Sequence, residues 1–323
     1  MQKLLTITTL TAIVLALSIV TDVNAQWPDY TQVAQQNYIE IGGRALIRPG
    51  TDLQLSILQD ATTAETLFTA EQATSAASAA GVELSYHFQT RHGRNLEFRV
   101  FTGTWDAQST IDQGNIESPL FPGDVADFVD YNYDSRIFSF ELNNKRALRQ
   151  GVTLFGGPRY LSFNDEISFV AGVNANPIGG VPFATERRES FEAINNLIGL
   201  QTGLRFEKQA TKFYRGAGFI RVGGYYNPTK VRTSQQAGLT VLPPTELLRT
   251  ESTKSTGSLL VEVGGKLYLD LAPKCSLFAG YEATWIDGIA LAPPSFLSPQ
   301  TLEVETANTL FFHAITFGMR FGW

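Results

Sequence analysis

The most constraining feature of this sequence is a two-residue alternation between apolar and polar side chains. From residue 80 to 89, one set of alternate positions holds Ala, Val, Leu, Tyr and Phe, and the other holds Gly, Glu, Ser, His and Gln. Because successive side chains of a β-strand point to opposite faces, this pattern predicts a strand with one apolar and one polar face. A chain built from such segments is restricted to all-β folds.

The same two-faced pattern recurs along the chain. It covers ten segments: Tyr38 to Ile47, Ala80 to Gln89, Asn95 to Trp105, Tyr133 to Asn143, Val152 to Phe163, Glu192 to Phe206, Phe213 to Tyr226, Ser258 to Asp270, Cys275 to Ile286 and Thr309 to Trp323. The segments at 152–163 and 213–226 are the weakest, because both of their faces carry aromatic residues or Gly. Most segments have 10 to 15 residues, which exceeds an average globular strand and suits a tilted membrane strand of about 9 to 11 residues.

The connections between these segments alternate between short and long. The short ones lie at 90–94, 144–151, 207–212 and 271–274, and the long ones lie at 48–79, 106–132, 164–191, 227–257 and 287–308. Outer-membrane barrels have this asymmetry, with short periplasmic turns and longer external loops. The sequence therefore predicts a transmembrane up-and-down antiparallel β-barrel of about ten strands, with twelve as the alternative.

The N-terminus carries the features of an export signal. Lys3 precedes an apolar stretch, and Val23-Asn24-Ala25 is a small-x-Ala cleavage site, so we expect cleavage after Ala25. The expected organisation is a signal peptide at 1–25, a periplasmic segment at 26–37 and an outer-membrane barrel at 38–323. No later segment has the roughly 18 to 20 apolar residues that a spanning helix needs.

Charged residues inside the predicted strands belong on the polar face. An Arg or Lys near the middle of a lipid-facing wall would cost about 2 to 4 kcal/mol, so we expect these residues to line the lumen: Glu40, Arg44, Glu83, His87, Glu97, Arg99, Glu141, Arg205, Glu262, Lys266, Glu282 and Arg320. Acids and bases are nearly balanced in this set, which suits an internal network of ion pairs. Aromatic residues near segment ends are candidates for the interfacial girdles: Trp105, Tyr133, Tyr226 and Trp285.

The last predicted strand ends the chain on an aromatic residue. Alternate positions near its end are Phe317, Met319, Phe321 and Trp323. This pattern resembles the C-terminal signal that the outer-membrane barrel assembly machinery reads, and an ordinary strand that happens to end the chain is the alternative.

Several stretches resemble the β-barrel porin family of planctomycete outer membranes. They include residues 140–143, 154–161, Ala279 to Pro293 and the closing run from Leu310 to Trp323. The resemblance spans about residues 38 to 323 and is strongest after 133. It implies a barrel in the outer membrane and a transport activity, and it supplies no catalytic residues.

The sequence offers little for other chemistry. Three His residues are too few and too scattered for a metal cluster, and one Cys excludes an intramolecular disulfide. An acidic balance of −6 argues against nucleic-acid binding. We therefore predict no catalytic residues, no metal and no cofactor. Residues 63–80 fit either a short helix at the barrel mouth or a surface loop.

A ten-stranded barrel lies near the size at which side chains fill the interior. We expect a monomer with outer-membrane lipid and the assembly machinery as partners, acting as a porin that passes small polar solutes through a narrow or gated lumen. The alternative is a structural or adhesive barrel that acts through its long external loops, and a third possibility is a soluble secreted β-protein.

Overall fold

The computed structural model describes residues 37–48, 56–63, 65–69, 78–90, 95–112, 116–117, 125–174, 184–211, 213–239, 245–292 and 306–323. The predicted signal peptide and the segment 26–36 lie outside these residues. No helix in the described residues is long and apolar enough to cross a membrane.

Within the described residues, ten antiparallel strands close into a barrel in sequence order, which confirms the predicted fold. These strands are β1 (Tyr38–Ile47), β4 (Ser78–Gln89), β5 (Asn95–Ile111), β8 (Phe128–Arg149), β9 (Val152–Asn174), β10 (Ala184–Gln209), β11 (Tyr214–Leu239), β12 (Thr245–Ala272), β13 (Cys275–Ile289) and β14 (Asn308–Gly322). The seam is an antiparallel pairing of β1 with β14, from Tyr38 opposite Gly322 to Ile47 opposite His313. The alternative of twelve strands is wrong.

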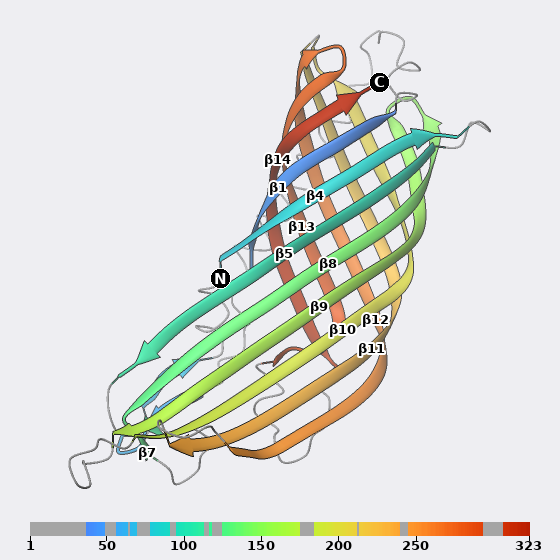
Figure 1. Ribbon diagram of the computed structural model, residues 1–323. Coiled ribbons are helices and arrows are strands. Elements are labelled where there is room, and N and C mark those ends of the chain that lie inside the picture. Colours follow the sequence, from blue (N-terminus) through green and yellow to red (C-terminus); the bar gives the residue numbers. More distant parts are fainter. Residues whose placement is uncertain are drawn as a thin grey trace.

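The two ends of the barrel differ, and we call them the turn end and the loop end. The short connections lie at the turn end, where the backbone N–H of Trp323 donates to the carbonyl of Asn37 (3.1 Å). Toward the loop end the strands stop at different heights: β1 has 10 residues and β12 has 28. Figure 1 shows that β8 to β12 continue far beyond the ends of β1, β4 and β14, so one side of the wall is much taller than the other.

The tall wall is where the sequence-based boundaries are wrong. Residues 164–174 and 227–239, expected in long loops, continue β9 and β11, and β12 begins at Thr245 rather than Ser258. These extensions stay paired residue by residue, as between Arg232 and Glu251. The alternation continues through these extensions, but the apolar residues move from the outward face to the inward face. A prediction that follows one apolar face along the sequence therefore ends the strand too early.

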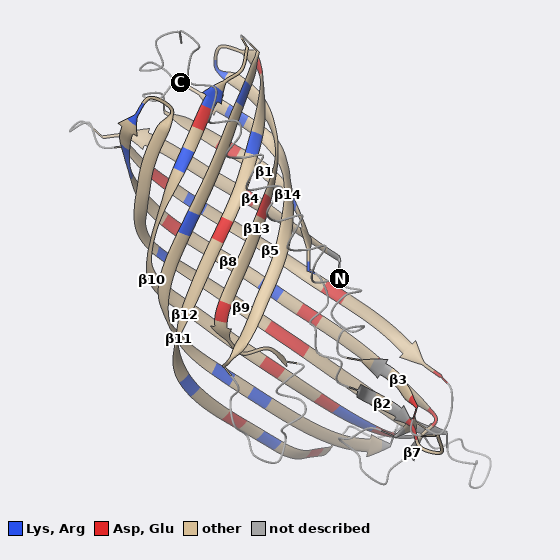
Figure 2. Ribbon diagram, turned by 180° about the vertical axis from the view of Figure 1, so that it is seen from behind, with Lys and Arg blue, Asp and Glu red and all other residues tan. Residues whose placement is uncertain are grey.

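The reversal of polarity is clear along β8. Toward the turn end its outward side chains are Phe138 and Phe140, and the inward Glu141 is fully buried. Toward the loop end the outward side chains are Asp134 and Arg136, which form an exposed ion pair (2.8 Å). We call these two parts the turn half and the loop half. Figure 2 shows charged residues placed along the strands in both halves.

The inward faces reverse as well, and this overturns two girdle assignments. Trp105 and Tyr133 are fully buried inside the barrel, because at their level the inward face has become the apolar one. Tyr226 is exposed on the outer surface, as an interfacial aromatic residue would be.

A second, smaller sheet accompanies the loop half. It consists of β2 (Ser56–Asp60), β3 (Thr66–Thr69), β6 (Ile116–Glu117) and β7 (Val125–Ala126) in the order β3-β2-β6-β7. Asp60 closes the turn between β2 and β3, because its Oδ1 accepts the N–H groups of Thr62 and Thr63 (2.8 Å each). These two hydrogen bonds stabilise the carboxylate and lower the pKa of Asp60. The described part of 63–80 thus contains strand β3, which the sequence did not predict.

The chain turns into the barrel where β13 ends. Gly288 has φ of 80°, and a Cβ atom there would lie 2.5 Å from the carbonyl oxygen of Gly257. Only Gly adopts this conformation readily at such a close approach. The turn directs residues 288–292, which we call the plug segment, into the interior, where Ile289 to Ala292 are buried.

Candidate functional site

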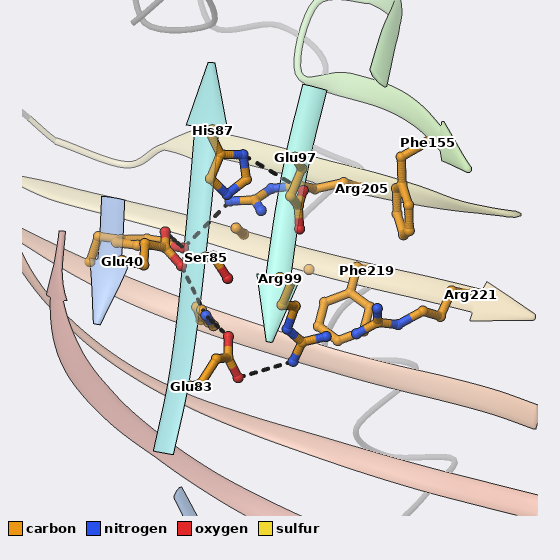
Figure 3. A pocket seen from close by; sticks show the side chains of 14 residues that line it. Glu40, Glu83, Ser85, His87, Glu97, Arg99, Phe155, Arg205, Phe219 and Arg221 are labelled. Atoms are coloured by element: carbon orange, nitrogen blue, oxygen red, sulfur yellow. Dashed lines mark hydrogen bonds and ion pairs between the residues drawn. The ribbon is translucent and has the colours of Figure 1, made fainter. Parts of the chain in front are cut away.

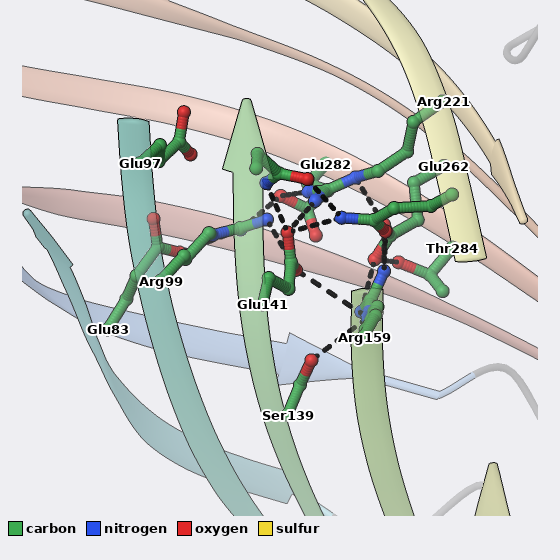
Figure 4. A network of polar contacts seen from close by, with 12 residues as sticks. Glu83, Glu97, Arg99, Ser139, Glu141, Arg159, Arg221, Glu262, Glu282 and Thr284 are labelled. Atoms are coloured by element: carbon green, nitrogen blue, oxygen red, sulfur yellow. Dashed lines mark hydrogen bonds and ion pairs between the residues drawn. The ribbon is translucent and has the colours of Figure 1, made fainter. Parts of the chain in front are cut away.

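The interior of the turn half is crossed by a ring of eight buried charges, which we call the ionic layer. It consists of four Arg and four Glu from eight of the ten barrel strands: Arg44, Glu83, Arg99, Glu141, Arg159, Arg221, Glu262 and Glu282. None of these residues is more than 5% exposed. Figure 4 shows most of them converging on one level of the barrel.

One part of the ionic layer joins β1, β4, β5 and β13. Arg44 donates to Glu83 and to Glu282 (2.8 Å each). Arg99 donates to the same two carboxylates (3.0 and 2.9 Å) and to Glu141 (3.4 Å). Each carboxylate is thereby shared between two guanidinium groups.

The other part of the layer centres on Arg159 and Glu262. Arg159 donates to both carboxylate oxygens of Glu262 (2.6 and 3.2 Å), which is the bidentate geometry that makes Arg–carboxylate pairs strong. Arg221 donates to Glu141 (2.5 Å) and contacts Glu262. The β10 strand contributes an uncharged partner, Gln201, whose amide donates to Glu141 (2.9 Å).

The ionic layer has no net charge, since its four cations and four anions cancel. Taking charges out of water is costly, and removing one partner of a buried pair leaves an uncompensated charge that costs about 3 to 5 kcal/mol. The layer is therefore stable only when all of its members are present.

The twelve charged residues predicted for the lumen all lie on inward faces, at two levels. Six of them belong to the ionic layer. The other six lie nearer the turn end: Glu40, His87, Glu97, Arg205, Lys266 and Arg320. Sequence reasoning missed Arg159 and Arg221 because both lie in the two weakest segments, where Gly and aromatic residues occupy both faces.

Glu40 is the centre of the level nearer the turn end. It accepts hydrogen bonds from Lys266 (3.0 Å), Arg320 (2.8 Å) and the hydroxyl of Tyr268 (3.0 Å). Lys266 also donates to Glu83 (3.1 Å), which links this level to the ionic layer. Arg320 lies over the ring of Tyr38 (3.9 Å from the centroid).

His87 lies beside a buried Lys–Glu pair. Its ring stacks on Tyr38 with centroids 3.8 Å apart, and its Nδ1 lies 2.8 Å from the Nζ of Lys145. Lys145 forms an ion pair with Glu97. Because a Lys ammonium can only donate, the neutral ring of His87 accepts this hydrogen bond through Nδ1.

A small cavity lies among these side chains, as Figure 3 shows. Its volume is about 40 Å³, and Glu40, His87, Arg99 and Arg205 are among the residues that line it. By the usual requirement of 10 to 15 Å³, it has room for about three water molecules. A wider pocket of about 350 Å³, lined by Tyr38, Asp270 and Arg320, lies at the turn end.

The interior of the loop half is closed by aromatic and aliphatic side chains. The ring of Trp105 on β5 makes edge-to-face contacts with Phe163 on β9 (6.4 Å) and with Phe312 on β14 (5.8 Å). These rings come from distant parts of the wall and are fully buried together. We call this packed region the apolar layer, and it includes Leu58 and Ile116 of the small sheet.

The plug segment is held by side chains of the wall that bind its backbone. Asn195 on β10 donates to the carbonyl of Ala290 (2.8 Å) and accepts the N–H of the same residue (2.9 Å). The carbonyl of Gly288 accepts from Ser258 (2.6 Å) and from Asn227 (3.2 Å). Buried polar side chains thus supply the hydrogen bonds that a neighbouring strand would otherwise give.

A buried ion pair fixes the end of the plug segment. The Oδ2 of Asp165 accepts the N–H of Ala292 (2.9 Å), and its Oδ1 lies 3.1 Å from Arg48. Tyr133 contacts both Arg48 and Asp165. This cluster lies within the apolar layer, so its charges are sheltered from water.

Among the residues that the structure describes, one buried acid of the loop half has no hydrogen-bond partner. Neither carboxylate oxygen of Glu189 is hydrogen-bonded, although Arg187 lies 3.7 Å away. Burial raises the pKa of Glu189 to about 7, and the charge of Arg187 opposes this shift.

No protein-family model matches the sequence, and no curated protein matches it. Solved structures with a similar fold include the outer-membrane protease OmpT of Escherichia coli (9% identity, 94% of this chain and 100% of that chain, TM-score 0.37). A second is the translocator domain of the autotransporter NalP of Neisseria meningitidis (10% identity, 100% of this chain and 98% of that chain, TM-score 0.37). A third is CarO2 of Acinetobacter baumannii (14% identity, 88% of this chain and 99% of that chain, TM-score 0.27). These identities and TM-scores are too low to indicate what this chain does.

Proposed function

We propose that this chain is an outer-membrane β-barrel that is closed to solutes and that presents its loop half outside the cell for binding. The predicted export signal and the outward apolar side chains of the turn half support an outer-membrane location. Those side chains run along β12 from Leu259 to Leu271, both exposed. At about 3.3 Å per residue and a tilt of about 45°, this run is roughly 28 Å tall, close to the apolar band of such barrels.

The loop half has the opposite surface. Its outward face carries ion pairs between neighbouring strands, as between Arg232 and Glu192 (3.0 Å) and between Arg232 and Glu251 (3.3 Å). Charged side chains at this density suit water, so we place the loop half above the membrane. The tall wall of β8 to β12 then stands on the external surface.

The observation that carries the proposal is the double closure of the interior. The ionic layer fills one level of the barrel, and the apolar layer with the plug segment fills the next. The small cavity beside the ionic layer has room for only about three water molecules, so it is too small to span the barrel. A solute would have to displace both layers to pass.

Conductance of the purified protein in planar bilayers tests the closure. We expect no channel steps across a range of pH and voltage, with a large general porin as the positive control for the assay. Stable steps from the wild-type protein would contradict a closed barrel.

The binding role has a separate test. The hairpin of β11 and β12 can be shortened by joining the cross-strand pair Thr233 and Thr250 through a two-residue turn, which leaves the turn half untouched. We expect cells that display the shortened chain to lose attachment or autoaggregation while the barrel still folds. Unchanged attachment would remove the binding role.

The second candidate is a gated porin. The resemblance to the planctomycete family implies a transport activity, and the small strand number and balanced lumen charges favour a narrow or gated pore. The observation in its favour is that the plug segment is held by side chains such as Asn195 rather than by strand pairing. Conductance that appears in Asn195→Ala and is absent from the wild type would favour this candidate.

We also propose that the assembly machinery reads the end of β14. Phe317, Met319, Phe321 and Trp323 are exposed on the outer surface, which keeps them accessible to a partner before the barrel closes. Trp323→Ala should lower the amount of heat-modifiable, membrane-inserted protein in cells. It should leave refolding of the purified chain in detergent unchanged.

A further inference from the structure

In the described part of the turn end, three exposed cations have no carboxylate partner. Arg146 and Arg149 lie at the end of β8, and Lys274 lies in the turn between β12 and β13. All three are exposed, and within the described part of the chain none of them forms an ion pair. This arrangement differs from the loop half, where Arg136, Arg188 and others are paired with neighbouring acids.

The acids at this end are already engaged. Glu207 forms an ion pair with Arg205 (2.6 Å). Asp270 accepts from Ser276 (2.6 Å) and pairs with Arg215 (3.4 Å). The described residues of the turn end therefore present a net positive surface to their surroundings.

Exposed apolar side chains lie next to these cations. Leu148, between Arg146 and Arg149, is 54% exposed, and Leu271, three residues before Lys274, is 56% exposed. Leu154 is directly opposite Arg146 in the strand register. This mixture suits an interface in which long basic side chains lay their stems along apolar surface and extend their charged ends toward headgroups.

We propose that two separate basic turns of the turn end, with Arg146 and Arg149 at the β8–β9 turn and Lys274 at the β12–β13 turn, bind the phosphate groups of anionic phospholipids in the periplasmic leaflet. The inference rests on the proposed membrane orientation, which places the turn end at that leaflet. Arg presents a planar fork that matches phosphate oxygens, and Lys adds a point charge. The exposed Leu residues favour a lipid over the polar glycan of a cell wall, because they gain from contact with acyl chains.

The test compares lipid retention on the folded full-length barrel by native mass spectrometry. The protein is refolded in zwitterionic micelles and mixed with equal amounts of phosphatidylglycerol and phosphatidylcholine. We expect about tenfold preference for phosphatidylglycerol, reduced to about twofold in the triple variant Arg146→Gln, Arg149→Gln, Lys274→Gln. Raising the salt to about 0.5 M should weaken the preference, since these charges are exposed.

Arg136→Gln is the matched control, because Arg136 is exposed on the same strand but paired with Asp134 in the loop half. It should keep the wild-type preference. Equal retention by the wild type and the triple variant would overturn the proposal. So would competition by inorganic phosphate at the same concentration as lipid, or binding to peptidoglycan sacculi without lipid preference. Failure of the wild type to insert into any bilayer would instead contradict the proposed function.

Discussion

The turn half and the loop half use the same strands in opposite ways. In the turn half, apolar side chains face outward and charges are buried inside, as with Phe140 and its neighbour Glu141. In the loop half, charges face outward and apolar side chains are buried, as with Arg136 and its neighbour Ile137. One alternating strand can therefore face lipid along one part of its length and water along the other. The only change needed is that the apolar residues switch from the outward face to the inward face.

The ionic layer gives the largest expected effect. Arg159→Met leaves Glu262 without its bidentate partner and should lower the free energy of unfolding by about 3 to 5 kcal/mol. Urea unfolding in phosphocholine vesicles measures this change. Arg136→Met removes an exposed pair of the loop half and should cost no more than about 1 kcal/mol. Equal losses of unfolding free energy in the two variants would mean that the buried ion pairs of the turn half contribute no more to stability than the exposed pairs of the loop half.

Outward positions along β10 locate the boundary between the halves. Leu200 is 68% exposed in the turn half, and Leu200→Arg should destabilise the inserted barrel by about 2 to 4 kcal/mol because the charge enters the lipid. Ser190→Arg, on the same outward face in the loop half, should change stability by about 0.5 kcal/mol or less. A large cost at both positions would place the loop half in the membrane as well.

A substitution that loosens the plug segment tests how the interior of the loop half is closed. Asn195→Ala removes the partners of both backbone groups of Ala290, which should cost roughly 2 to 3 kcal/mol. Faster hydrogen exchange at the amides of Ala290 and Ala292 would report the local opening. Asn196→Ala, which removes the outward neighbour that accepts from Tyr160 (2.7 Å), is the control and should leave these amides protected.

The smallest expected effect on stability comes from Glu189, and this effect depends on pH. Its pKa is raised from 4.5 to about 7 in the folded state. The folded chain therefore holds a proton that the unfolded chain has released between these values, and stability falls as the pH rises through this range. Glu189→Gln should remove this slope and add on the order of 1 kcal/mol at pH 8. An unchanged slope would mean that Glu189 is already paired.

The parts of the fold that the sequence predicts are those where local pattern and environment agree. The bounds of β1, Tyr38–Ile47, match the predicted segment, because its apolar face points outward throughout. The extension of β11 to Leu239 was missed because its outward residues, such as Lys230 and Arg232, are the type expected in a loop.

The interior was harder to predict than the wall. Arg159 lies directly after Gly156-Gly157-Pro158, a run that hides the alternation, and its pairing with Glu262 joins residues 103 positions apart. The contact of Asn195 with Ala290 spans 95 positions. Such pairs follow from barrel closure and from the turn at Gly288, and no local pattern encodes either.

The position of the seam has a consequence for how the barrel is made. Arg44 on β1 pairs with Glu282 on β13, and Glu40 on β1 pairs with Arg320 on β14, so the first strand finds part of its charge partners on the last two. An unfinished barrel, lacking β13 and β14, would leave each of these β1 charges with only part of its partners, Arg44 with Glu83 on β4 and Glu40 with Lys266 on β12. The interior network is therefore completed only when the C-terminal strands arrive, so closure of the barrel is most favourable after the whole chain has been made.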